Sequence, residues 1–240
     1  MATHVNEIVA GVLEHVQLTV VAVGIGLAIS LPLAVLSYRR RYIYAPVTRF
    51  TGLLYSIPSL ALFALLVPYT GLSTTTAEIG LVSYTLLILI ANTVAGLDAV
   101  PSEVSEAALG MGFTDRQILW RVRLPLALPV IVAGIRIATV TTIGLVTVTA
   151  LIGKGALGAL ILVGLNRSFP TPILIGAGLS VVLAVAADAL LLGVQRALTP
   201  WAPRGARGVR EVGPRSNGVP PHTPEGASPR DQGAGVRAFG

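Results

Sequence analysis

The sequence predicts an all-α membrane protein with about five transmembrane helices, and three features lead to that prediction. Hydrophobic residues make up 53% of the 240 residues, whereas charged residues make up only 12%. The mean hydropathy is +0.78. A soluble domain of this length would need a much larger charged surface. Each spanning helix needs roughly 20 apolar residues, and residues 1–199 have room for about five, forming one transmembrane domain.

The first apolar run is expected to be a retained helix whose N-terminus lies outside the cell. This run, residues 18–36, contains no charge and is longer than the core of a signal peptide, and Met1–His15 before it lacks a basic region. A group of arginines follows the run: Arg39, Arg40, Arg41 and Arg49. Because positive residues favour the cytoplasmic side, this loop is expected inside. Five spans then leave the C-terminus in the cytoplasm.

The second and third spans, at about 50–68 and 79–97, carry polar residues that are candidates for a translocation path. Ser56, Pro58 and Ser59 interrupt the second span, and Asn92 lies near the inner end of the third. Polar and proline-bearing membrane helices usually face protein or water. Two alternatives remain open, because proline also makes simple packing kinks and a buried Asn often bonds a neighbouring helix.

The fourth span, at about 126–150, contains Arg136 inside an apolar run. A charge at that depth is costly unless it is paired or reaches the headgroups. Asp188, in the fifth span at 173–194, is the expected partner in a structural ion pair near the inner face, with contact to substrate as the alternative. Between these spans, glycines at 153, 155 and 158 favour a broken segment on the outer side.

Residues 101–125 form a charged island between the two apolar halves of the chain. Ser102–Leu109 reads as a short helix that ends at the glycines Gly110 and Gly112, and Thr114 can cap a second helical turn before Pro125. Two short helices that meet at a glycine would form a rigid cytoplasmic knob for a partner protein. The alternative is an ordinary polar loop.

The island resembles the E-A-A…G…I-x-L-P motif of the membrane subunits of ABC importers. The matching positions are Glu106, Ala107, Ala108, Gly112, Val122, Leu124 and Pro125, with Val122 in the place of the usual Ile. The resemblance extends over about residues 16–198, through the stretches H-V-Q-L-T, I-P-S-L-A-L-F-A-L-L-V-P, L-P-L-A-L-P-V-I-V-A-G-I-R and A-L-I-G-K-G-A-L-G. These stretches are similar to permeases of the glycine betaine, carnitine and choline branch, although Lys154 stands where a small residue is expected.

The resemblance implies a type I ABC importer permease in the plasma membrane of a prokaryote. Its implied partners are ABC ATPase subunits, which use ATP and Mg²⁺, an external solute-binding protein, a second permease copy of the same or a related kind, and membrane lipid. Gly112 would supply the turn of the knob, and Glu106 would pair or cap there or in the ATPase groove. The implied cargo is a quaternary amine such as glycine betaine, carnitine, choline or proline betaine. An amino acid or other small solute, and a non-transporting scaffold, remain alternatives.

The rest of the sequence indicates neither an enzyme nor a binder of nucleic acid. Residues 200–240 are rich in Pro, Gly, Arg and Ser and predict a disordered cytoplasmic tail. The chain has no cysteine, and its three histidines lack metal-ligand spacing. No phosphate loop is present, so no cofactor of its own and no ATP hydrolysis are expected. The net charge of +6 lies in loops and tail rather than along a soluble face.

Overall fold

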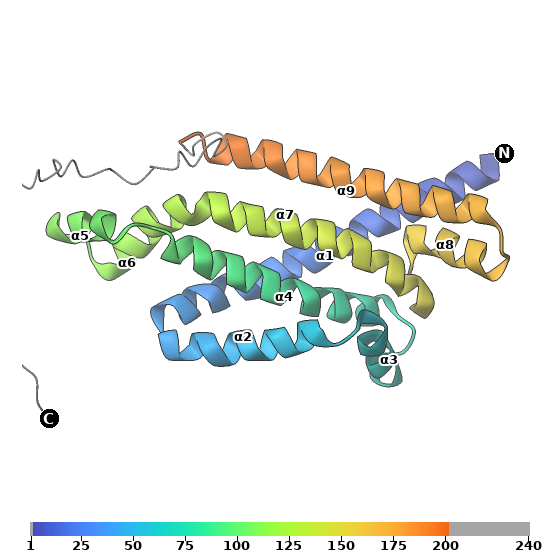
Figure 1. The fold of residues 1–240 in the computed structure, drawn as a ribbon, viewed down its shortest axis with the longest axis horizontal. Coiled ribbons are helices and arrows are strands. Elements are labelled where there is room, and N and C mark those ends of the chain that lie inside the picture. The colour runs from blue at the N-terminus through green and yellow to red at the C-terminus, as the bar shows by residue number, and fades with distance from the viewer. Residues whose placement is uncertain (1, 202–240) are drawn as a thin grey trace, which may run out of the picture. The chain divides into compact units, whose positions relative to one another are not determined.

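A computed structural model describes residues 2–201, with side chains from Asn6 onward, and every regular element in that range is a helix (Figure 1). The long helices are α1 (Ala2–Arg39), α4 (Thr74–Asp98), α7 (Leu124–Val148) and α9 (Pro170–Leu198). Four stretches within the described residues are long and apolar enough to cross a membrane, and a bent helix pair raises the number to five. Apart from Pro200 and Trp201, the predicted tail lies outside the described residues.

The second predicted span differs most from its expectation, because it is two helices rather than one. Helix α2 (Arg41–Ser56) and helix α3 (Ser59–Thr70) meet at an angle of 95°. The bend follows from Pro58, since a proline disfavours helical geometry in the residue before it, and Ile57 is extended with φ −69° and ψ 127°. Helix α2 also starts well before residue 50, so that the basic residue Arg49 lies inside it.

Helices α1, α4 and α7 form the centre of the bundle. Helix α4 packs against both α1 and α7, whereas α9 packs mainly against α7 and the short helix α8 (Ala156–Asn166). One buried cluster, which includes Leu18, Phe63 and Leu81, fills the space between α1, α3 and α4. A second cluster, which includes Leu97, Leu119 and Ile131, lies at the opposite end of α4. The bundle is therefore packed along the whole length of α4.

The charged island forms a helix pair whose second member does not end at Pro125. Helix α5 (Ser102–Gly110) is followed by α6 (Asp115–Ile118), a π-helical turn η1 (Leu119–Arg123) and then α7, and together residues 115–152 form one helix of 38 residues. In η1 the Leu124 N–H donates to the carbonyl of Leu119, one residue further back than in an α-helix. The expected break at Pro125 is replaced by this change of bonding, which lets the chain pass a residue that has no N–H.

At the other end of the bundle, α7 passes into a short 3₁₀ helix, η2 (Thr149–Ile152), and then into a turn at Gly153 with φ +75°. Helix α8 follows and runs beside the start of α9 (Figure 1). This is the broken segment that the glycines at 153, 155 and 158 indicate. It lies at the end of the molecule away from α5 and α6 (Figure 1).

Candidate functional site

The knob, defined here as residues 102–118, is closed by a tight turn at Gly112. The Phe113 N–H donates to the Ala108 carbonyl at 3.1 Å, and the Gly112 N–H donates to the Leu109 carbonyl at 2.9 Å. These two bonds form a Schellman motif, which ends a helix with a residue of positive φ. Gly112 occupies that position with φ +85°. The predicted role of Gly112 as the turn residue agrees with this geometry.

The second helix of the knob begins with a capping box. The Gln117 N–H donates to Thr114 Oγ1 at 3.4 Å, and the Thr114 N–H donates to Gln117 Oε1 at 2.8 Å. The predicted cap at Thr114 is therefore present, and Gln117 completes it. The first helix differs from its expectation, because Pro101 rather than Ser102 occupies the cap position and no side chain bonds there.

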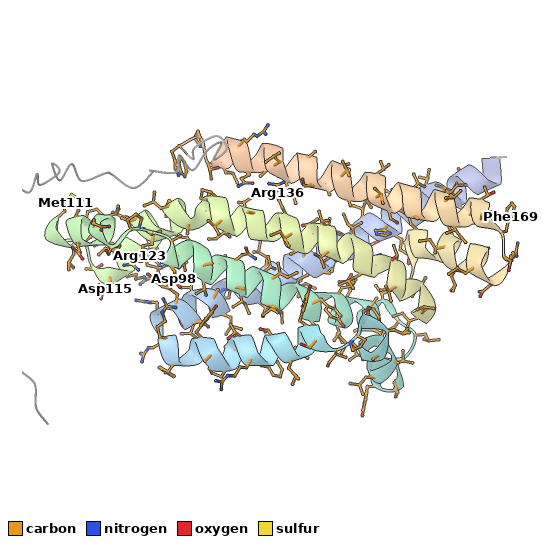
Figure 2. The ribbon with its side chains drawn as sticks, in the orientation of Figure 1. Asp98, Met111, Asp115, Arg123, Arg136 and Phe169 are labelled. Carbon is orange, nitrogen blue, oxygen red and sulfur yellow. The ribbon has the colours of Figure 1, made fainter. Side chains whose placement is uncertain are left out.

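The knob presents one face to the bundle and one to its surroundings. Ser105 and Ala108 are buried against the following helix, where Ile118 and Leu119 are also buried. Glu106 and Ala107 are exposed, and Met111 is 71% exposed at the tip (Figure 2). Glu106 makes no hydrogen bond or ion pair among the described residues. The remaining motif positions, Val122, Leu124 and Pro125, are half-buried where η1 joins α7.

A set of polar contacts ties the knob to the C-terminal ends of α1 and α4. Arg123 Nε donates to Ser105 Oγ at 2.9 Å, and the Arg123 guanidinium lies 5.4 Å from the centre of the Tyr38 ring. Arg41 lies 5.7 Å from the same ring and pairs with Asp98 at 2.5 Å. Arg123 and Asp98 both lie at the knob end of the bundle (Figure 2). No pattern in the sequence indicates these contacts, because each joins residues from separate elements.

A cleft of about 870 Å³ separates the basic turn after α1 from the knob. Arg39, Arg40 and Arg41 line it together with Glu106 and Asp115 of the knob. Arg39 and Arg40 have no ion-pair partner among the described residues. The arginines that predict the cytoplasmic side therefore lie at the same end of the molecule as the knob.

The structure brings Arg136 and Asp188 together in a bidentate ion pair between α7 and α9. Arg136 Nε donates to Asp188 Oδ1 at 2.9 Å, and Arg136 Nη2 donates to Asp188 Oδ2 at 2.8 Å. Gln195, which the sequence did not single out, accepts from Arg136 Nη1 at 3.2 Å and donates to the Pro129 carbonyl at 3.0 Å. This planar, two-bond geometry holds a charge far more firmly than a single contact.

The candidate path residues do not converge within one chain. Ser56 Oγ donates to its own helix at the Gly52 carbonyl, and the Tyr84 hydroxyl donates to the Ile57 carbonyl at the 95° bend. Asn92 lies on α4 about two helical turns from Tyr84, roughly 12 Å along the helix axis. Its amide donates to the Ile88 carbonyl at 2.8 Å, within its own helix. Pro58 is exposed at the bend and Ser59 is half-buried.

No group of three or more His, Asp or Glu side chains that could hold a metal ion occurs among the described residues. His15 is fully buried in α1, and its Nε2 lies 3.0 Å from the Ile143 carbonyl of α7. Its ring therefore links two central helices, as a buried polar side chain commonly does in a membrane bundle.

Long apolar helices that carry an exposed helical knob at one end define a multi-pass membrane protein. Residues 22–200 match the family model of the binding-protein-dependent transport system inner membrane component, and the chain belongs to this family. It is a multi-pass membrane protein that serves transport as a permease. The predicted fold class, family and permease role are thereby confirmed.

Curated relatives and a solved structure cover most of the chain. The Osmoprotectant import permease protein OsmW of Salmonella typhimurium is 39% identical over 78% of this chain and 89% of its own. The Glycine betaine/carnitine/choline transport system permease protein OpuCB of Bacillus subtilis is 34% identical over 83% of this chain and 90% of its own. The inward-facing MetNI methionine ABC transporter superposes with a TM-score of 0.73 at 25% identity, over 83% of this chain and 99% of that chain.

Proposed function

We propose that this chain is the permease subunit of an ATP-driven importer that admits a quaternary-amine solute: glycine betaine, carnitine, choline or proline betaine. The observation that carries the transport mechanism is the knob, a glycine-closed helix pair built onto a continuous helix that enters the membrane. The similarity to permeases named for osmoprotectants, glycine betaine, carnitine and choline supports the solute class.

An ABC ATPase subunit holds the knob from the cytoplasm in this proposal. Glu106, Ala107 and Met111 offer it an exposed surface, and the turn at Gly112 keeps the two short helices in a fixed relation. The ATPase binds ATP and Mg²⁺ and grips the knob differently in its open and closed states, because only a differential interaction can drive a conformational change. Val122, Leu124 and Pro125 carry the movement into α7.

The knob end of the bundle also supports a membrane orientation. The arginines at 39–41 lie beside the knob at the cleft, which supports a cytoplasmic knob, an external N-terminus and a cytoplasmic C-terminus. The external solute-binding protein then docks at the opposite end, near the turn between α8 and α9. Lipid surrounds the largely exposed apolar face of α9.

The solute path lies between two permease copies, either identical or related. Ser56, Pro58, Ser59 and Asn92 do not meet within one chain, so a path that uses them needs a second chain to complete its wall. Arg136 and Asp188 have a structural role in this proposal, because each satisfies the other in a bidentate pair.

The test is uptake into liposomes that contain the chain, its ATPase and its solute-binding protein. We expect ATP-dependent accumulation of labelled glycine betaine, choline or carnitine, and ATP hydrolysis that rises when the binding protein and solute are added. Accumulation of methionine instead would overturn the solute class and favour the amino-acid alternative. Methionine is the amino acid to test, because the solved structure that the chain resembles is a methionine transporter. A chain that neither binds an ATPase nor supports uptake would be a scaffold.

A further inference from the structure

We propose that Tyr38, Arg41 and Arg123 are positioning residues that join the knob to α1 and α4, so that these helices follow α7 when the knob is moved. The proposal rests on the proposed function and assigns a route for its coupling. The three residues come from the end of α1, the start of α2 and the π-helical turn. The two arginines both lie beside the aromatic ring of Tyr38.

The knob has a direct connection to only one central helix. Helices α6, η1 and α7 are continuous, so a displacement of α6 acts on α7 as on one rod. Helix α1 has no such connection to the knob. Helix α4 is separated from α5 by Ala99–Pro101, a break in the helix before the cap residue Pro101. Movement of α1 and α4 with the knob therefore depends on contacts between side chains.

The observed contacts supply that connection without a gap. Ser105 of α5 accepts from Arg123, Arg123 and Arg41 both lie against the Tyr38 ring, and Arg41 pairs with Asp98 at the end of α4. A guanidinium that lies near an aromatic ring is attracted to the negative face of the ring. The chain of contacts thus runs from the first helix of the knob, through the end of α1, to the end of α4.

The Tyr38 ring is itself anchored in the bundle. It is half-buried and packs against the buried cluster that contains Leu97 of α4, Leu119 of η1 and Ala127 of α7. One side chain therefore packs against a cluster to which three elements contribute, and its ring lies beside two arginines. A displacement of Arg123 with the knob is passed to a group that cannot move alone.

The solvent-exposed contact of this route, the Arg41–Asp98 pair, contributes little to stability. A variant of this pair can therefore test a coupling role without unfolding the chain. The side chains of Arg41 and Asp98 are 60% and 37% exposed, and exposed ion pairs add little to the free energy of folding. Loss of such a pair should leave the chain folded and weaken only the connection of α4 to the ring of Tyr38.

The first test measures the chain alone, by hydrogen–deuterium exchange of the α5 amides in detergent. We expect Arg123→Gln and Tyr38→Leu to speed exchange in residues 102–110 several-fold, because α5 loses its tie to α1. Tyr38→Phe keeps the ring and should exchange like the parent. Tyr42→Leu is the matched control, since Tyr42 is 72% exposed on α2 and outside the contact route. Unchanged exchange in Arg123→Gln and Tyr38→Leu would overturn the proposal whether or not the chain transports the expected solute.

The second test measures solute imported per ATP hydrolysed in the reconstituted complex. We expect the ratio to fall several-fold in Tyr38→Leu while ATPase binding is kept, and to be restored in Tyr38→Phe. Arg41→Gln and Asp98→Asn act at exposed positions that leave the core untouched, and they should lower the ratio as well. A normal ratio in these two variants, or an equal loss in Tyr38→Leu and Tyr38→Phe, would count against coupling through the ring. Absence of uptake by the parent would count against the proposed function instead.

Discussion

Arg136 and Asp188 show how one charge inside an apolar helix constrains a second helix. Reversal of one charge, by Arg136→Asp or Asp188→Arg, places two like charges opposite each other at membrane depth. We expect each single variant to unfold at a lower temperature than the parent, because it loses the paired contact and sets two like charges against each other. The double variant should recover part of this loss. Thermal unfolding in detergent measures it, and a double variant as unstable as the sum of the singles would contradict a direct pair.

Gly134 lies at a close approach of α4 and α7. A Cβ atom there would lie 2.5 Å from the Cβ and 3.0 Å from the Cγ of Asn92, too close for either atom to stay in place. We expect Gly134→Ala to lower the stability of the bundle by about 1–3 kcal/mol, as overpacking does. Gly144→Ala on the same helix is the control, because nothing lies within 4 Å of its added atom. Equal unfolding temperatures for the two variants would show that the helices do not touch there.

Single residues were predictable from the sequence where their own chemistry left few choices. A charge in an apolar run needs a partner, which led from Arg136 to Asp188, and a threonine before a short helix indicated the cap at Thr114. Tyr38 and Gln195 were missed, because an aromatic at a helix end and an amide in a span are ordinary in membrane proteins. Their roles arise from what the fold places beside them.

At the scale of elements, the turn at Gly112 fixes the relation of the two helices of the knob. Nothing lies within 4 Å of a Cβ atom added at Gly112 or at Gly110, so the two positions differ in backbone conformation rather than in space. Gly112 has φ +85°, where a β-branched residue is strongly disfavoured, whereas Gly110 is helical. We expect Gly112→Val to insert normally in the membrane but to lose most of its uptake. Gly110→Val should transport. Normal uptake by Gly112→Val would remove the knob from the coupling mechanism.

The positions of the long helices could be predicted from the lengths of the apolar runs, whereas the junctions between helices could not. Run length predicted where helices α1, α4, α7 and α9 lie, because a bilayer sets how many apolar residues a span needs. Pro58 and Pro125 read alike in the sequence, yet the first produces a bend of 95° and the second lies in a continuous helix beside a π-turn. The difference depends on whether neighbouring backbone groups can rebond, which local sequence does not determine.

For the whole molecule, the separation of its two ends allows the orientation to be tested directly. The knob and the basic turn lie at one end, and the turn between α8 and α9 lies at the other, with Met111 and Phe169 as labelled markers (Figure 2). The mechanism requires the first end to face the cytoplasm, because the ATPase must reach the knob there. It requires the second to face the solute-binding protein.

The natural absence of cysteine makes this orientation simple to measure. Met111→Cys and Phe169→Cys place one thiol at each end, at positions that are 71% and 54% exposed. In intact cells without an outer barrier, a membrane-impermeant maleimide should label Phe169→Cys and leave Met111→Cys unlabelled until the membrane is opened. The physical reason is the positive-inside rule, under which the arginines beside the knob would keep that end in the cytoplasm. Labelling of Met111→Cys in intact cells would place the knob beyond the reach of a cytoplasmic ATPase, and the coupling mechanism would fail with it.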